Sequence, residues 1–345
     1  MKRIVVFLLL ILAILGTACQ ITRAGMATED EGRIPIRVLI LPKFETGEMA
    51  GDFPGEAQFY YEGYLAGGDE YEIRGGYEGH KLYVKDGVAL YVTGAGKVNA
   101  SSSTLAVLLD DRFDFSDAYV ISTGCCGSAE GTTVMGDVFI ASAAVDQELG
   151  HNADPRDMED PSRPTWFHDS TYDDSAFVFL DKDLIDRVFE LVKDVRLETT
   201  EKTKAYMAYS FDDAEWALRD PKVLKGTTAS SDDYWKGKYE EEVAIFVVQT
   251  YGCPDPYVCS EMEDVGIGVV LRHLGMLDRY IIIRGSVNMD VYMKGSTPES
   301  LWVKGSSAEL ESEDSEEAAD IFPVAMENNF KVGKVIIDAI LGGQI

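Results

Sequence analysis

Four segments of the sequence carry residue types that could do chemistry on a small polar ligand. Two are glycine-rich and follow short apolar runs, at residues 93–100 and 121–128. The third is acidic, at 260–264, and the fourth is polar, at 284–290. Glycine turns let a backbone approach a ligand closely, and carboxylates accept hydrogen bonds from ligand hydroxyls. These types together favour a cradle for an oxygen-rich molecule.

The first glycine-rich segment, TGAGKVNA, places Gly94, Ala95 and Gly96 between an expected strand and an expected helix. The free backbone amides at a helix N-terminus favour an oxygen-rich group there. A tight strand-to-helix turn needs the same residues, so the segment alone leaves both interpretations open.

The second segment, STGCCGS, has small residues where a strand is expected to end, including Gly124, Cys125 and Gly127. The adjacent thiols suggest a nucleophile, but no histidine stands near them in the sequence to activate one. Small packing residues are therefore the favoured interpretation over thiol catalysis.

Acidic and aromatic residues supply the remaining candidates. Glu263 could accept hydrogen bonds from two vicinal hydroxyls, as on a ribose, although acids are also common at helix starts because of the helix dipole. Tyr234 and Trp235 could stack on a base, or they could lie in the core. The polar residues from Arg284 to Asp290 follow an expected buried strand.

The elements that must position these residues alternate along the chain. We expect strands at 36–41, 118–122, 137–144 and 280–284, a hairpin of 81–84 with 88–93 around Asp86-Gly87, and helices at 98–109, 180–195, 265–274 and 323–341. Such alternation predicts an α/β sheet with helices on both faces. Ligands bind at the carboxyl ends of the strands in such sheets.

Composition excludes several classes of function. The chain has 345 residues with 31 Lys plus Arg and 60 Asp plus Glu, a formal charge of −29, which disfavours nucleic acid as a partner. The sequence has no CxxC pair and no histidine cluster, so we expect no metal site and no cofactor. Cys253 and Cys259 could close a short disulfide loop if the protein is exported.

The first nineteen residues resemble an export signal. A basic start, an apolar run and small residues before Cys19 give residues 1–19 the layout of a signal peptide. We expect an exported protein, periplasmic or on the cell surface, and leave open whether Cys19 is lipidated. Residues 20–35 are interpreted as a linker and 36–345 as a single domain. No later segment reaches eighteen unbroken apolar residues, so no further transmembrane segment is expected.

The order of TGAGKVNA, STGCCGSAEGTTVMGDV, SEMEDVG and RGSVN resembles the nucleoside phosphorylases and methylthioadenosine nucleosidases. FPGEAQFYYEG, DRFDFSDAYVISTG, QELGHNADPRD, SDDYWKG and MEDVGIGVVLRHLG resemble the purine nucleoside permease family more closely, over about residues 36–341. The resemblance implies a nucleoside phosphorylase-like three-layer sandwich, with a mixed central sheet flanked by helices. It also implies a purine nucleoside as ligand and a homo-oligomer.

The resemblance further implies a role for each matching residue. Glu263 matches the ribose-binding glutamate, with Met262 under the sugar and Gly94 and Ala95 touching the ribose. Cys125, Gly124 and Gly96 match the nucleophile or phosphate pocket, and Gly127, Tyr234 and Trp235 match the base site. Asn288 stands where an aspartate protonates the leaving purine, Asp290 is the fallback acid, and Glu45 and Glu48 lie near the glutamate that activates water.

One departure bears on the choice of nucleophile. Bacterial phosphorylases have an arginine for phosphate where this chain has Ser122, and only Lys43 stands near the first strand. Because arginine supplies bidentate contacts to a dianion, water is the favoured nucleophile over phosphate. We therefore expect hydrolytic cleavage of the N-glycosidic bond of a purine nucleoside. The alternative is a non-catalytic nucleoside-binding component of nucleoside uptake.

Overall fold

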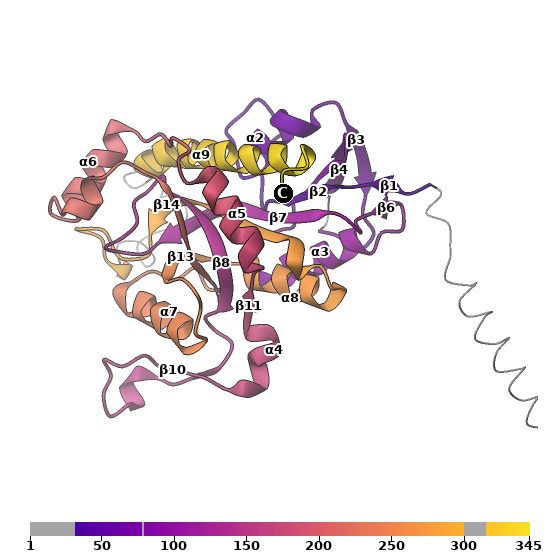
Figure 1. Ribbon diagram of the computed structural model, residues 1–345. Coiled ribbons are helices and arrows are strands. Elements are labelled where there is room, and N and C mark those ends of the chain that lie inside the picture. The colour runs from indigo at the N-terminus through magenta and orange to yellow at the C-terminus, as the bar shows by residue number, and fades with distance from the viewer. Residues whose placement is uncertain (1–31, 78, 300–314) are drawn as a thin grey trace, which may run out of the picture.

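A computed structural model describes residues 32–77, 79–299 and 315–345 (Figure 1). The expected signal peptide, Cys19 and most of the expected linker lie outside these residues. The end of that linker forms β1 (Ile34–Pro35), which pairs in parallel with β6 (Phe113–Asp114). No helix within the described part of the chain is long and apolar enough to cross a membrane.

Ten strands of the described chain form one mixed sheet. Its order is β11 (Phe177–Phe179), β8 (Val138–Asp146), β12 (Val223–Ser230), β13 (Tyr257–Glu261), β7 (Tyr119–Ser128), β2 (Val38–Leu41), β5 (Val88–Tyr91), β4 (Lys81–Lys85) and β3 (Asp69–Glu72). The tenth strand, β14 (Tyr280–Met289), pairs with both β7 and β8. The pairings β7–β13, β13–β12, β12–β8, β8–β14 and β14–β7 return to their starting strand, so this half of the sheet closes on itself.

Helices cover both faces of the sheet (Figure 1). α9 (Ser315–Leu341) crosses β14 and β7 on one side together with α5 (Lys182–Val192), and α3 (Lys97–Leu108) packs beside α8 (Asp264–Leu274) on the other. α7 (Lys238–Thr250) packs against β12 and β13. α2 (Gln58–Tyr60) and α6 (Glu201–Ser210) contact α9, and α4 (Asp173–Ala176) contacts α8. The predicted α/β class with helices flanking a mixed central sheet is confirmed.

Apolar runs explain why the central strands form. All four residues of β2 and all nine of β8 are buried, as expected for strands covered on both faces. The predicted hairpin between β4 and β5 is also confirmed. Asp86 and Gly87 both have positive φ, 50° and 80°, the geometry of a tight hairpin turn.

Two strands are longer than the sequence indicated. β7 continues through the expected glycine turn to Ser128, and β14 continues through the expected polar loop to Met289. Each is kept extended by pairing with partners far away in sequence, which local signals do not reveal. β13 was not expected, so Ser260 and Glu261 belong to a strand and not to the head of a helix.

The cysteines do not form the disulfide that the sequence allowed. Cys125, Cys126, Cys253 and Cys259, the cysteines of the described chain, are all free. Cys259 is buried on β13 in a small cluster with Cys126 on β7, so its side chain lies in the interior instead of on the loop that carries Cys253.

Candidate functional site

One cavity brings together most of the residues that the sequence singled out. Of the predicted site residues it is lined by Ala95, Cys125, Gly127, Tyr234, Trp235, Met262, Glu263 and Asn288. Lys43, Phe44, Glu56, Cys126, Asp233, Ser260, Glu261 and Arg284 complete its wall. The cavity therefore lies where β7, β13 and β14 meet the loops after β2, β5 and β12, which supply its remaining side chains.

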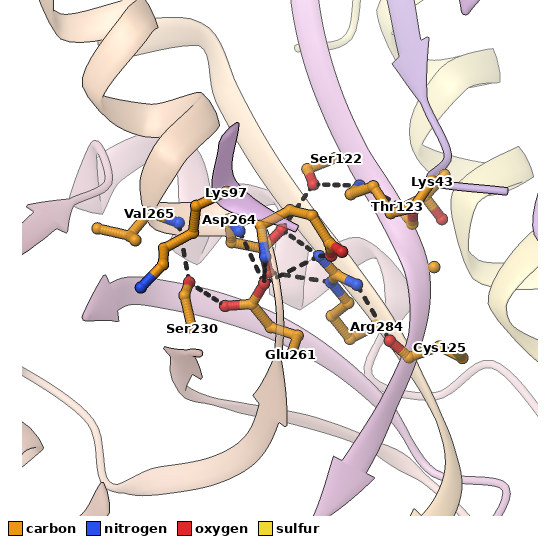
Figure 2. A network of polar contacts seen from close by, with 12 residues as sticks. Lys43, Lys97, Ser122, Thr123, Cys125, Ser230, Glu261, Asp264, Val265 and Arg284 are labelled. Carbon is orange, nitrogen blue, oxygen red and sulfur yellow. Dashed lines mark hydrogen bonds and ion pairs between the residues drawn. The ribbon is translucent and has the colours of Figure 1, made fainter. Parts of the chain in front are cut away.

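A buried arginine organises the acidic side of the cavity (Figure 2). Arg284, on β14, donates through Nη2 to Asp264 at 2.7 Å, Glu263 at 3.0 Å and Glu261 at 3.1 Å. Its Nη1 donates to the Cys125 carbonyl at 3.0 Å. All three acids and Arg284 are buried, so each charge relies on the others in place of water.

Glu261 holds the start of α8. Its Oε2 accepts hydrogen bonds from the backbone amides of Glu263 at 2.6 Å and Asp264 at 2.7 Å, and its Oε1 accepts one from Ser230. The first amides of a helix lack partners within the helix, so a carboxylate there stabilises the helix start. Burial raises the pKa of Glu261 to about 7.

Glu263 joins the acidic network to the first glycine turn. Its Oε1 accepts a hydrogen bond from the Gly96 amide at 3.0 Å, while its Oε2 faces Arg284. Gly96 has φ +86°, a left-handed conformation that favours glycine, and it precedes the first residue of α3. The carboxylate of Glu263 is thus fixed from two sides at the cavity wall.

Glu56, in the loop after β2, is a further buried acid in the cavity wall. Its two oxygens accept hydrogen bonds from the backbone amides of Cys125 and Lys43, both at 2.7 Å. Burial raises the pKa of Glu56, although Lys43 and Arg284 act in the opposite direction. A side chain at Gly124 would lie 2.5 Å from Glu56 Oε1, so glycine there makes room for the carboxylate.

Lys43 lies beneath Glu56 with its ammonium group fully enclosed. Nζ donates to the carbonyls of Leu41 at 2.6 Å and Thr123 at 3.1 Å, and to Ser122 Oγ at 2.8 Å. Ser122 in turn donates to Asp264 at 2.6 Å. Burial lowers the pKa of Lys43. These bonds link the end of β2 to the acidic network through β7.

The opposite end of the cavity is less charged. A bulge in β14 between Ser286 and Asn288 sets Asn288 opposite Gly127 of β7. Asp290 lies behind this wall, where it accepts hydrogen bonds from Ser260 at 2.6 Å and Tyr257 at 2.5 Å. Burial raises the pKa of Asp290 to about 6. Asn288 lines the cavity, and its amide nitrogen donates to the Met289 carbonyl at 3.2 Å. Its amide oxygen can act as a hydrogen-bond acceptor.

The aromatic pair is carried by the loop that follows β12. Glu148 accepts hydrogen bonds from the backbone amides of Asp232 at 2.8 Å and Asp233 at 3.2 Å. Lys97, at the start of α3, forms ion pairs with Glu148 and, at 2.9 Å, with Asp146. Together these contacts anchor the loop that carries Tyr234 and Trp235 at the edge of the cavity.

The remaining predicted site residues lie outside the cavity wall. Glu45 accepts hydrogen bonds from the backbone amides of Ala57 at 2.9 Å and Gln58 at 2.6 Å, so its carboxylate caps α2. Glu48 is exposed and lines a separate hollow with His80 and Lys81. The sequence-based expectation that Glu45 or Glu48 activates water therefore has no geometric support, because neither carboxylate reaches the cavity.

Gly94, Gly96, Gly124 and Asp290 also do not line the cavity. Gly94 packs against the ring of Tyr77, Gly96 supports Glu263, and Gly124 supports Glu56. These residues shape the site from behind and do not line it.

Sequence reasoning did not single out Glu56, and it placed Arg284 in the polar segment 284–290 without giving it a role. Glu56 stands in the FPGEAQ motif, but nothing local distinguishes it from Glu45 or Glu48. Arg284 directly follows the apolar run Tyr280 to Ile283 of β14. A charged residue at such a buried position is almost always paired, so the position itself indicated a buried acidic partner.

Two curated proteins resemble this chain over part of its length. The chain is 30% identical over 226 residues to a probable purine nucleoside permease of Schizosaccharomyces pombe, covering 57% of this chain and 63% of that one. It is 30% identical over 212 residues to a purine nucleoside permease of Candida albicans, covering 56% and 52%. The chain thus spans between about half and two thirds of the length of these curated relatives.

Solved structures share the fold at low sequence identity. A methylthioadenosine/S-adenosylhomocysteine nucleosidase of Neisseria meningitidis, in complex with methylthio-immucillin-A, superposes with a TM-score of 0.52 at 16% identity, over 88% of this chain and 99% of that one. A Helicobacter pylori nucleosidase variant with 5′-methylthioadenosine in the active site gives a TM-score of 0.53 at 16% identity, with the same two coverages. These neighbours establish a nucleosidase-like fold.

The family itself follows from the sequence. A family model described as purine nucleoside permease matches residues 35–343, nearly the whole described chain and every element that contributes to the cavity. The protein belongs to the purine nucleoside permease family.

Proposed function

We propose that this protein binds a purine nucleoside in the cavity and hydrolyses its N-glycosidic bond outside the cytoplasm. The observation that carries the proposal is the acidic network of Glu263, Arg284 and Glu56 at one end of a cavity whose other end holds Asn288 and two aromatic side chains. The charged residues suit the hydroxyls of a ribose, and Asn288 with the aromatic rings suits a purine base. The nucleosidase-like fold is consistent with a nucleoside as ligand.

Glu263 would bind the sugar. A carboxylate can accept hydrogen bonds from two vicinal hydroxyls, and the Gly96 amide and Arg284 hold this one rigidly. Because the carboxylate is already oriented before the ligand binds, binding loses little side-chain conformational entropy. Met262 would pack beside the ribose.

Glu56 would activate the water. General bases work best when their pKa lies near the operating pH, and burial raises the pKa of Glu56 in that direction. Hydrolysis adds this water to the sugar carbon while the carbon–nitrogen bond breaks. The water proton passes to Glu56, and the electron pair of the broken bond leaves with the base, which takes a proton from solvent. The rate should therefore fall as the pH drops through the raised pKa, because protonated Glu56 cannot accept that proton.

The charge balance favours water over phosphate. Around the described cavity there are two cations, Lys43 and Arg284, and five carboxyl groups: Glu56, Asp233, Glu261, Glu263 and Asp264. An excess of negative charge stabilises a sugar that becomes cationic during bond cleavage and repels a phosphate dianion. The departing base would be stabilised by the Asn288 amide.

A second candidate function is capture of a nucleoside for uptake, without cleavage. The matched relatives are named permeases, and the Asn288 amide has no ionisable proton for a leaving base. In this case the same contacts of Glu263, Tyr234 and Trp235 would hold an intact nucleoside.

The test is to incubate the purified protein with inosine and with adenosine, each with and without phosphate, and to measure free base by chromatography. We expect base release without phosphate and no gain when phosphate is added. Release that depends on phosphate would replace hydrolysis by phosphorolysis. Nucleoside binding by calorimetry without base release would reject cleavage and leave the uptake function.

Two variants test the residue assignments. Glu56→Gln should keep binding and lose base release, whereas Glu48→Ala, on the exposed carboxylate outside the cavity, should change neither. Glu263→Ala should weaken nucleoside binding about 10- to 150-fold, as expected for a lost hydrogen bond to a charged group. Normal nucleoside binding by folded Glu263→Ala would show that the ribose site is assigned wrongly.

A further inference from the structure

Asn329 lies on α9, the last helix of the chain, yet its side chain reaches strands that carry the cavity. It is 1% exposed. Its amide nitrogen donates to the carbonyls of Gly124 at 3.3 Å and Ile283 at 3.1 Å. Its oxygen accepts from Thr123 Oγ1 at 2.6 Å and Tyr60 OH at 2.7 Å. A single amide thus joins β7, β14 and α2 beneath the site.

Both carbonyls belong to peptide units that hold cavity residues. The peptide between Gly124 and Cys125 has its carbonyl on Asn329 and its amide on Glu56. The carbonyl of Ile283 belongs to the peptide that leads into Arg284. Since a peptide unit is planar, fixing its carbonyl also fixes the direction of its amide. Asn329 therefore controls where the Cys125 amide points.

We propose that Asn329 is a positioning residue for catalysis, which aims the Cys125 amide at the Glu56 carboxylate and sets the backbone from which Arg284 reaches the acidic network. This inference rests on the proposed role of Glu56 as the base. Asn329 is not among the residues that line the cavity, and it acts through the two strands that it joins.

Loss of the hydrogen bond from the Cys125 amide to Glu56 would change the pKa of Glu56. The charged and titratable groups that act on Glu56 are Lys43 after β2, Tyr60 of α2, Cys125 of β7, Glu263 before α8 and Arg284 of β14. The Cys125 amide stabilises the ionised carboxylate and so lowers the pKa of Glu56 against the effect of burial. Without that hydrogen bond the pKa of Glu56 rises, and the active, deprotonated form appears only at higher pH.

Asn328, the preceding residue on α9, provides a matched control. It is equally buried, but its side chain bonds to the backbone of Gly136 and Glu198, away from Glu56. Replacing either asparagine by leucine removes a buried amide from the same helix. A purely structural role would make the two variants alike in activity and different only in stability.

The experiment compares Asn329→Leu and Asn328→Leu with the unchanged protein. For Asn329→Leu we expect kcat for nucleoside hydrolysis to fall about tenfold with a smaller change in KM, and the acidic limb of the pH–rate profile to move up by about one unit, the shift that loss of one ordinary hydrogen bond produces. Asn328→Leu should keep the position of that limb. Asn329→Ser, too short to reach both carbonyls, should behave like Asn329→Leu and serves if the leucine variant does not fold.

An infrared titration separates this inference from the proposed function. The carboxyl band that disappears in Glu56→Gln reports protonation of Glu56 without any substrate. Its midpoint should rise in the Asn329 variants and not in Asn328→Leu, even if the protein never cleaves a nucleoside. A midpoint unchanged in folded Asn329→Leu and Asn329→Ser would overturn the inference, whatever the assay of base release shows.

Discussion

Neighbouring carboxyl groups in the cavity differ in acidity because each meets a different partner. Burial raises the pKa of Glu261 to about 7. For Asp264 the charge and hydrogen bonds of Arg284, together with Lys43 and Ser122, outweigh burial and lower the pKa. One guanidinium cannot neutralise three adjacent acids equally. A proton shared within this group is therefore most stable on Glu261, which leaves Asp264 ionised beside Arg284.

Asp290 gives a prediction about stability at the residue scale. Its folded-state pKa is about 6, above the ordinary value of about 3.9 for an unfolded aspartate. The folded state therefore binds the proton more tightly, and stability falls as the pH rises through this interval. Relative to Asp290→Asn, which does not titrate, the protein should lose about 2 kcal/mol of unfolding free energy between pH 4 and pH 7.

Urea unfolding of both proteins across that pH range measures the difference. The same comparison with Glu48→Gln serves as a control, since Glu48 is exposed and outside the cavity. A difference between the aspartate and asparagine proteins that stays constant from pH 4 to pH 7 would show that Asp290 titrates alike in the folded and unfolded chains.

At the scale of elements, local signals predicted what local geometry determines. The Asp86-Gly87 turn, the helix after Gly96 and the buried strand β2 follow from patterns a few residues long. The lengths of β7 and β14 do not follow from such local patterns, because pairing between distant strands keeps their glycine and polar residues extended. The cavity lies along those extensions, so the sequence identified Glu263 and Asn288 by motif but not the convergence of Glu56 with Arg284.

The loop after β12 gives a prediction at this scale. Lys97 bonds to Asp146 and Glu148, its backbone amide donates to Asp232 at 2.8 Å, and the preceding amide of Gly96 holds Glu263. We expect Lys97→Met to release the loop that carries the aromatic pair. Nucleoside binding should weaken about tenfold or more, as for a lost charge-assisted hydrogen bond, while kcat at saturation changes less.

Calorimetry and steady-state kinetics test this together. Lys81→Met is the control, because Lys81 is on β4 and its exposed ion pair with Glu70 of β3 lies at the edge of the sheet, several strands from β12. Unchanged affinity in Lys97→Met, or an equal loss in Lys81→Met, would show that the Lys97 ion pairs do not position the aromatic residues.

For the whole molecule the dominant electrostatic feature is its excess of negative charge. With 60 acidic and 31 basic side chains, at least 29 acids cannot be matched one to one with a cation. Repulsion among many distant charges destabilises a compact chain, whereas exposed ion pairs such as Lys81–Glu70 act over 2.8 Å and contribute about 0 to 1 kcal/mol each. Salt screens distant charges more completely than close ones.

Added salt should therefore stabilise the protein. Raising sodium chloride from about 10 to about 150 mM shortens the screening length from about 30 to about 8 Å, which removes repulsion across the surface but little of the attraction within close pairs. We expect the melting temperature at pH 7 to rise by roughly 1 to 2 °C for each kcal/mol of repulsion removed, because the unfolding entropy of a domain of this size is large. Near pH 4.4, the isoelectric point, the net charge vanishes and the gain should disappear. A melting temperature that falls with salt at pH 7 would mean that close ion pairs, and not the net charge, dominate the electrostatic stability of this fold.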